Sequence, residues 1–376
     1  MENRNSESSS KNPWLWVPSL YFGQGIPYVT VMMVATVMYK RMGVSNTELA
    51  LYTSWLYLPW VIKPFWSPLV EVLQTKRWWI VAMQLLIGAG LAGVAYAIPG
   101  DNFLGTTMAF LWLLAFSSAT HDVAADGFYL VGLDSHEQAW FVGLRSTFFR
   151  LALIAGQGLL VMLAGRLETR SDNSNIAGAW STTFYVAAAV MVILGIYHWI
   201  CIPRLENDRR SVNESSGLFK AMVTSVTSFF AKPYMGLIIA YVLTYRLGEA
   251  QLGKLATPFL LDARDKGGLE MPTEWVGFAY GTVGVLCLLA GGILGGWLAA
   301  RDGLKRWLWV MVAAINLPNL SYVLLAYIQP ENRLVILTAI AVEQFGYGVG
   351  FTAFMLYLMY AARGENETVH YALCTG

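Results

Sequence analysis

The chain has 376 residues, of which 56% are hydrophobic and only 13% are charged, and its mean hydropathy is +0.49. This composition is far from that of soluble globular proteins and predicts an all-α protein that crosses a membrane several times. The net charge of +1 gives no sign of a nucleic-acid partner, and the three cysteines lack the spacing of a metal or redox motif. We therefore expect no metal and no cofactor.

Apolar runs long enough to span a bilayer recur along the chain between short polar segments. A transmembrane helix needs roughly 20 apolar residues. We predict ten spans, at residues 13–39, 49–72, 79–99, 104–133, 137–165, 179–202, 233–261, 274–300, 307–329 and 334–362. A further apolar stretch begins in "TVHYALCTG" and stops after a few residues, so we expect an eleventh span that is cut short.

The polar segment 1–12 precedes an apolar run that is too long for the core of a cleavable signal peptide. The first helix is therefore expected to act as its own insertion signal. Thirteen lysines and arginines lie in the predicted loops on the side of the N-terminus, and seven lie on the other side. Because loops rich in these residues stay in the cytoplasm, this places the N-terminus there.

The longest polar connection, residues 203–232, divides the spans into two groups. It predicts a six-helix bundle at 13–202, a cytoplasmic linker, and an incomplete second bundle at 233–376. A weak repeat supports this division: "SPLVEVLQTKRWW" follows the second span and "GGWLAARDGLKRWLW" follows the eighth. The second copy resembles a conformational loop of the major facilitator superfamily, whose fold has two six-helix halves. An Asp-Gly turn followed by positive charges is the alternative. The residues concerned are Asp302, Gly303, Lys305 and Arg306.

Nine charged residues fall inside the predicted spans. A charge at the bilayer centre costs about 2.5–3.5 kcal/mol, so these side chains should face a cavity or each other. Buried ion pairs can also serve only to fix how helices pack. For the nine residues taken together, a role in transport is a better explanation than a role in helix packing alone. The residues are Lys63, Asp122, Asp126, Arg145, Arg150, Arg246, Glu249, Lys254 and Glu343.

The fourth and fifth spans form a predicted antiparallel hairpin around the turn "LDSHEQA". Asp126 and Arg145 lie the same number of residues before and after this turn. Asp122 and Arg150 lie at nearly equal distances from it. The aspartates share one helix face, whereas the arginines diverge, so one or both pairs close. We predict that Asp122 binds the coupled proton and that Asp126 with Arg145 is the structural pair, while Asp126 stays a second candidate for coupling.

The first span contains "FGQGIPY", in which Gly23, Gly25 and Pro27 predict a break or a bend of the helix that serves gating. Close helix packing is the alternative for the glycines. Aromatic residues are abundant and mostly belong to the lipid interface. Tyr28 and Tyr245 are candidates for stacking on sugar rings in a substrate cavity.

Several segments together resemble AmpG-type muropeptide permeases, a branch of the major facilitator superfamily: "YFGQGIPY", "LPWVIKPFWSPLVE", "SSATHDVAADGFY", "YRLGEAQLGKLATPFLLD" and "EQFGYGVGFTAF". Two positions depart from the family pattern, because His121 stands for a glutamine and Tyr129 for an arginine. The resemblance implies import of anhydromuropeptides with protons across the bacterial inner membrane. It also implies proton coupling at Asp122 and Asp126 and cavity roles for Lys63, Arg246, Glu249 and Glu343.

Two other functions remain open from the sequence. A carrier of acyl-coenzyme A or another organic anion should have a denser cationic cavity than five intramembrane bases supply. A membrane-embedded enzyme would have to use His121 and Asp122, but adjacent helix residues diverge by about 100° and no nucleophile or metal motif accompanies them. We therefore predict a monomeric transporter, not an enzyme, whose partners are a sugar-peptide substrate, protons and the lipid bilayer.

Overall fold

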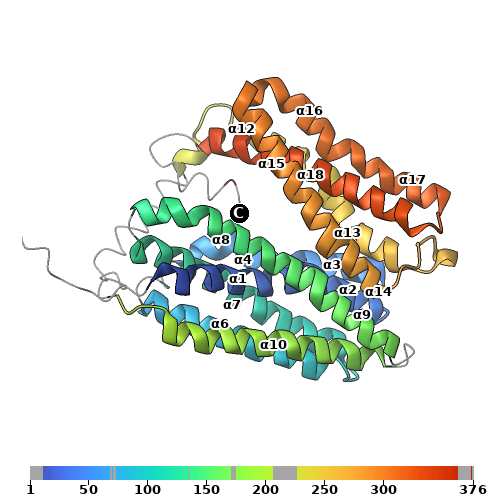
Figure 1. The fold of residues 1–376 in the computed structure, drawn as a ribbon, viewed down its shortest axis with the longest axis horizontal. Coiled ribbons are helices and arrows are strands. Elements are labelled where there is room, and N and C mark those ends of the chain that lie inside the picture. The colour runs from blue at the N-terminus through green and yellow to red at the C-terminus, as the bar shows by residue number, and fades with distance from the viewer. Residues whose placement is uncertain are drawn as a thin grey trace, which may run out of the picture. The chain divides into compact units, whose positions relative to one another are not determined.

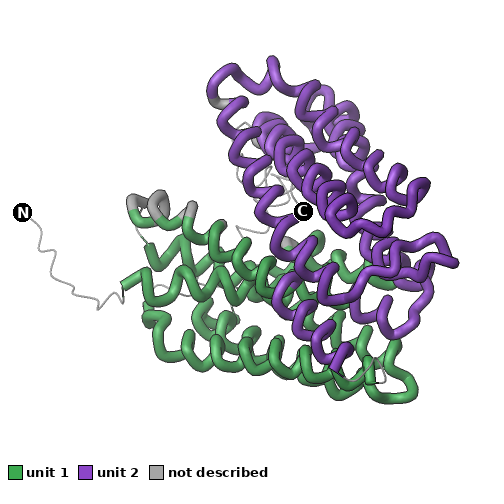
Figure 2. The backbone as a smooth tube through the Cα atoms, turned by 45° about the vertical axis from the view of Figure 1, so that its right-hand side comes forward, with its two compact units in different colours: residues 1–35, 52–156, 174–216 green, residues 36–51, 157–173, 217–376 purple. Residues whose placement is uncertain are grey.

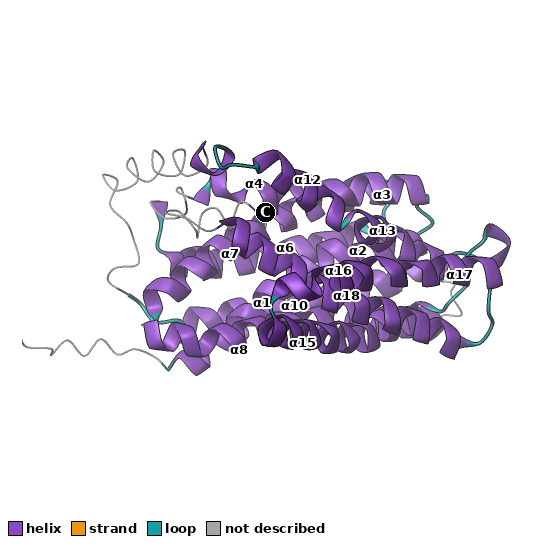
Figure 3. Ribbon diagram, turned by 90° about the horizontal axis from the view of Figure 1, so that it is seen from above, coloured by secondary structure: helices purple, strands orange, loops and turns teal. Residues whose placement is uncertain are grey.

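The computed structural model describes residues 12–67, 70, 73–133, 135–170, 175–205, 227–362 and 374. These residues form helices joined by short loops, with no strand among them (Figures 1 and 3). Most of the predicted central linker and the predicted start of an eleventh span lie outside the described residues.

Eight helical stretches in the described part are long and apolar enough to cross a membrane. Seven coincide with a predicted span to within four residues at each end, and the stretch Thr147–Arg170 begins ten residues after the start of the predicted span 137–165. The eight stretches are Pro13–Arg41, Lys76–Ala97, Phe103–Gly132, Thr147–Arg170, Ile176–Cys201, Thr273–Ala299, Leu304–Ile328 and Arg333–Leu358. The prediction of an all-α, multi-pass membrane protein is confirmed.

The two remaining predicted spans are built from shorter helices. Residues 49–72 include most of α3 (Asn46–Trp55), then α4 (Leu58–Ile62) and the 3-10 turn Lys63–Phe65. Prolines at the start of the last two elements explain the interruptions, because proline disfavours helical geometry in the residue before it. The second interrupted span consists of α12 (Met235–Tyr245) and α13 (Leu247–Leu261), which meet at Arg246.

Figure 2 colours two compact units of the chain, and the first comprises residues 1–35, 52–156 and 174–216. In this unit α6 (Lys76–Ala97) packs against both α7 (Phe103–Gly132) and α10 (Ile176–Cys201). Helix α1 (Val17–Val29) packs against α7, α10 and α8 (Ser135–Leu153). Its core contains edge-to-face aromatic pairs such as Trp16 with Phe128, whose ring centres are 5.1 Å apart.

The second unit comprises residues 36–51, 157–173 and 217–376. Helix α18 (Arg333–Ala362) packs against α15 (Val285–Asp302), α16 (Leu304–Asn316) and α17 (Leu320–Ile328). Helix α14 (Thr273–Phe278) packs against α9 (Val161–Arg170). Two short stretches from the first half of the sequence, which carry α9 and most of α2 (Ala35–Arg41), are therefore part of this unit.

The expected helix break at Gly23, Gly25 and Pro27 is wrong, because α1 continues through all three residues. A Cβ atom on Gly25 would lie 2.5 Å from the Cβ of Ala152 and 2.9 Å from the carbonyl oxygen of Phe149. This glycine therefore serves close helix packing. The irregularity comes later, as the π-helical segment Thr30–Val34.

Two further π-helical segments, Ile154–Leu160 and Ala279–Gly284, approach each other at Gly158 and Gly281, which both belong to the second unit. A Cβ atom on Gly281 would lie only 2.2 Å from the Cα atom of Gly158, so position 281 requires glycine. A Cβ atom on Gly158 would lie 3.4–3.5 Å from the backbone of Gly281, which is ordinary contact.

Candidate functional site

Asp122 lies on α7 and is 7% exposed. Its Oδ2 accepts a hydrogen bond of 3.1 Å from the indole Nε1 of Trp60, on α4. The side chains of Gln24 and Lys63 also act electrostatically on this carboxyl group. Oδ1, however, has no hydrogen-bond partner within the described part of the chain. Asp122 is thus a buried acid that is only partly satisfied, which is a common property of groups that exchange protons.

Of the two acid–base pairs that the hairpin allows, the one between Asp122 and Arg150 is not formed among the described residues. The reason is rotational: Arg150 is five residues beyond Arg145 on the same helix and points in another direction. Trp60 supplies the hydrogen bond instead, and Lys63 is the base that acts on the carboxyl group.

Asp126 and Arg145 are brought together, with Arg145 Nη2 3.1 Å from Asp126 Oδ1. The hydroxyl of Tyr21 donates to the same oxygen at 3.1 Å. The guanidinium of Arg145 also lies over the rings of Tyr21 and Tyr129, 4.7 and 5.1 Å from their centres. The side chains of Asp126 and Arg145 are 42% and 32% exposed, so a solute or water can reach them.

His121 on α7 and His198 on α10 are linked by buried hydrogen bonds through Gln84 on α6. Ser19 Oγ lies 2.9 Å from His198 Nε2, and His198 Nδ1 lies 2.8 Å from Gln84 Oε1. Gln84 Nε2 in turn lies 3.0 Å from His121 Nε2. Because Oε1 can only accept, His198 donates from Nδ1, and the Gln84 amide donates to His121. His121 therefore holds helices together, and it points away from Asp122.

We expect Gln84→Leu to destabilise the first unit, because it leaves polar groups of both His198 and His121 buried without a partner. Each such group costs about 1–3 kcal/mol. A total of about 2 kcal/mol corresponds to a thermal midpoint about 3 °C lower in a chain of this size. Thermal unfolding in detergent measures the effect. Gln251→Leu, at an exposed position, is the matched control, and an equal midpoint for both variants would contradict the assignment.

In the second unit, Arg246 lies at the break between α12 and α13 and pairs with Glu249, Nη2 to Oε2, at 2.9 Å. It also donates to the hydroxyl of Tyr347 at 3.1 Å. Its guanidinium lies 5.2–5.7 Å from the centres of three rings, those of Tyr347, Phe351 and Phe354. Side-chain contacts thus hold this arginine at a point where the helix is interrupted.

The two candidate tyrosines differ in their surroundings. Tyr28 is half-buried and packs against Trp60 and Phe149, with ring centres 5.5 and 5.8 Å apart, so it lies next to the tryptophan that binds Asp122. Tyr245 is buried, and its hydroxyl donates to the carbonyl oxygen of Gly350 at 2.8 Å. Its ring belongs to a hydrophobic cluster, so the structure places Tyr245 in the core and not in a substrate cavity.

Glu343 lies on α18 and is 4% exposed. Its Oε2 accepts a hydrogen bond of 2.9 Å from the amide of the adjacent Gln344. Glu249, Tyr280 and Tyr322 are close enough to interact with it electrostatically. No base forms an ion pair with Glu343 in the described part of the chain.

A group of ion pairs near the ends of α2, α9 and α13 was not predicted from the sequence. Glu168, whose side chain is 2% exposed, accepts from Arg41 Nε at 3.1–3.2 Å and from the hydroxyl of Thr273 at 2.8 Å. Arg166 pairs with Glu274 at 2.7 Å. The only available signal was that acids and bases recur in predicted loops on the same side of the membrane.

Asp262 belongs to the same group and bonds to Lys40 and Asn46. Burial opposes ionisation of Asp262, but hydrogen bonds from Asn46 and Lys40 outweigh it and hold the pKa below its ordinary value. The carboxylate is therefore charged at neutral pH, which strengthens the ion pair.

The predicted conformational loop is an Asp-Gly turn in which Gly303 has a φ of 82°. Asp302 accepts from Trp307 Nε1 at 3.0 Å and from Arg301 Nε at 3.2 Å, and Arg306 lies 3.8 Å away. The hydrogen bonds from Trp307 and Arg301 hold the pKa of Asp302 below its ordinary value. Lys305 is exposed. The contacts fit the turn, and the conformational role remains a prediction.

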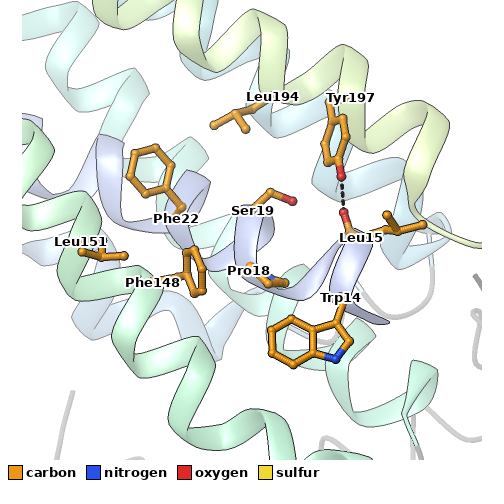
Figure 4. A pocket seen from close by; sticks show the side chains of 9 residues that line it. All are labelled: Trp14, Leu15, Pro18, Ser19, Phe22, Phe148, Leu151, Leu194 and Tyr197. Atoms are coloured by element: carbon orange, nitrogen blue, oxygen red, sulfur yellow. Dashed lines mark hydrogen bonds between the residues drawn. The ribbon is translucent and has the colours of Figure 1, made fainter. Parts of the chain in front are cut away.

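A groove with a volume of about 360 Å³ lies in the first unit, at the start of α1 and the end of α10. Figure 4 shows the side chains that line it. Its lining is mostly apolar: Trp14, Leu15, Pro18, Ser19, Phe22, Phe148, Leu151, Leu194 and Tyr197. None of the predicted charged site residues line it, so it does not serve as the candidate site for a polar solute.

The Major Facilitator Superfamily profile matches residues 19–372. The chain belongs to this superfamily. The protein AmpG 4 of Rickettsia conorii is 26% identical over 363 residues, which are 93% of this chain and 82% of that protein. The anhydromuropeptide permease of Escherichia coli K12 is 24% identical over 361 residues, which are 94% of this chain and 69% of the permease. The predicted resemblance to AmpG-type permeases is thus confirmed.

Solved structures show the same fold. The nucleoside transporter NupG aligns with a TM-score of 0.69 at 13% identity, over 96% of this chain and 84% of NupG. The xylose transporter XylE from Escherichia coli aligns with a TM-score of 0.61 at 14% identity, over 96% of this chain and 86% of XylE. The major facilitator fold predicted from the sequence is confirmed, and the chain is a membrane transporter and not an enzyme.

Proposed function

We propose that this transporter imports muropeptide-like products of cell-wall turnover, sugar-peptides with anhydro-amino-sugar groups, together with protons. It would act as a monomer in the bacterial inner membrane, with its N-terminus in the cytoplasm. The name of the Escherichia coli relative, anhydromuropeptide permease, supports the substrate class. The observation that carries the proton coupling is the burial of Asp122 with one carboxyl oxygen unpaired, next to a half-exposed pair formed by Asp126 and Arg145.

In this proposal Asp122 binds and releases the coupled proton. Burial of a carboxylate away from water is costly unless a base compensates the charge. Lys63 is the base that acts on Asp122, so movement of α4 relative to α7 would change the balance between the two protonation states. Helix movement and proton binding would then be linked.

The proposed substrate contacts are described for each unit by itself. In the first unit they are Lys63 and Tyr28, beside Asp122. In the second they are Arg246 and Glu249, at the helix break. Asp126 and Arg145 are proposed as the structural pair of the hairpin, and Arg150 as a base without a role in holding Asp122.

Uptake by proteoliposomes tests the substrate and the coupling together. We expect labelled anhydromuropeptide to accumulate when the outside is more acidic than the inside, and an uncoupler to abolish the accumulation. Uptake of acetyl-coenzyme A, the alternative substrate, is measured separately in the same kind of vesicles. Uptake of acetyl-coenzyme A alone would replace the proposed function by the organic-anion carrier, and uptake independent of the gradient would remove proton coupling.

A charge swap tests whether substrate contacts Arg246 and Glu249. We expect Arg246→Glu with Glu249→Arg to keep the ion pair but lose uptake, because the base leaves the three aromatic rings and the solute meets reversed charges. The matched control is the same swap at Arg166 and Glu274, an exposed pair, which should transport normally. Restored uptake in a folded Arg246–Glu249 swap would show that the pair is only structural.

A further inference from the structure

Glu343 is a buried acid that the proposed mechanism does not use for proton transfer. It lies ten residues after the start of α18, about 15 Å along the helix axis from Arg333. Its one hydrogen-bond donor in the described part of the chain is the amide of Gln344, which carries no charge. A carboxylate in such surroundings lacks the compensation that a buried charge requires.

The ionisable groups near Glu343 do not supply the missing positive charge. Glu249 on α13 is an acid, and it is already paired with Arg246. Tyr280 and Tyr322, from the π-helical segment Ala279–Gly284 and from α17, bond to each other through their hydroxyls. The charged residues of the neighbouring α15 and α16 lie at the ends of those helices: Arg301, Asp302, Lys305 and Arg306.

Glu343, Glu249 and Arg246 together carry two negative charges and one positive charge, which leaves one negative charge in excess among these three groups. Arg246 compensates Glu249, and a proton is the simplest compensation for Glu343. If an anionic group of the substrate took Arg246 from Glu249, the region would favour proton binding further. Binding of substrate and of a proton at this place would then be linked, and such linkage is reciprocal.

We propose that Glu343 is a second proton-binding site, in addition to Asp122, and that two protons therefore accompany each substrate molecule. This inference rests on the proposed proton-coupled import. Glu343 takes up one proton as a carboxylate on the side of entry and loses the same proton on the side of release, so charge and atoms balance over the cycle.

The first test is the accumulation ratio at equilibrium with a pH difference of one unit and the membrane potential clamped at zero. Two coupled protons support a ratio of about 100, whereas one supports about 10, because each proton contributes a factor of ten. We expect Glu343→Gln to lower the ratio about tenfold while substrate still enters. Glu331→Gln, an exposed acid on a loop, is the control and should keep the full ratio. A ratio of about 10 in the unaltered protein, unchanged in Glu343→Gln, would overturn the proposal.

The second test does not need a transported substrate, so it separates this inference from the proposed function. Infrared difference spectra of the purified protein between about pH 5 and about pH 9 should contain a carboxylic acid band that Glu343→Gln lacks. Glu343→Asp keeps a carboxyl group and should shift the band. This variant replaces Glu343→Gln in the test if the glutamine variant does not fold. An unaltered band in both variants would overturn the second site even if muropeptide uptake is driven by protons.

Discussion

Asp122→Asn should abolish accumulation of substrate against its gradient while leaving downhill exchange. Asparagine has nearly the same shape as aspartate, and its amide oxygen can still accept the hydrogen bond from Trp60. It cannot bind and release a proton, so the link between helix movement and the proton gradient is lost. Without that link the second proton, at Glu343, cannot drive accumulation either, so we expect the accumulation ratio to fall to about 1, from about 100 for a pH difference of one unit.

Asp126→Asn is the comparison that identifies the coupling acid. It weakens the contact with Arg145 at a half-exposed position, where ion pairs contribute about 0–1 kcal/mol, so gradient-driven accumulation should persist. Counterflow of labelled substrate without a proton gradient measures exchange in both variants. Full accumulation by Asp122→Asn at normal expression would remove Asp122 from the mechanism, and loss in Asp126→Asn alone would transfer the role to Asp126.

Glu168→Gln should cause the largest loss of stability among single changes of charge in the second unit. The substitution removes the carboxylate charge that pairs with Arg41, at a site where the acid is 2% exposed. Removing one partner of a buried pair costs about 3–5 kcal/mol, and about 3 is expected because Arg41 is 25% exposed. In a chain of this size that loss lowers the thermal midpoint by about 4 °C.

Glu274→Gln is the matched control, because it breaks a pair whose side chains are 63% and 37% exposed. Such pairs contribute about 0–1 kcal/mol, and less in high salt. The two variants therefore differ in burial and not in the chemical change. Equal midpoints for both in detergent would show that Glu168 is not held as a buried ion pair.

The sequence predicted the elements of this protein better than the contacts between them. Seven spans were located to within four residues at each end, since the apolar length needed to cross a bilayer is a local property of the chain. The pair formed by Asp126 and Arg145 was also predictable, because a tight turn between two helices places residues at equal chain distance side by side. The same counting failed for Asp122 and Arg150, whose side chains point in different directions.

The glycines of the first span show where local interpretation is insufficient. Gly25 and Pro27 both disfavour a helix in water, yet α1 is continuous through them. In a membrane the backbone has no water to bond to, and a neighbouring helix with Ala152 and Phe149 fits against the glycine. Only the position of that neighbour distinguishes a break from a packing site.

By itself, the sequence determined the class of the protein, its membrane-spanning segments and the presence of charged residues inside them, because hydrophobicity and helix periodicity depend on neighbouring residues. The tertiary structure alone decided which partner each charged residue has. Trp60 bonds to Asp122 across 62 positions, and Thr273 bonds to Glu168 across 105. It also showed that Glu343 is buried and accepts its hydrogen bond from the uncharged amide of Gln344. Such partners depend on how each helix is rotated and tilted against helices distant in the sequence, and no local pattern encodes that.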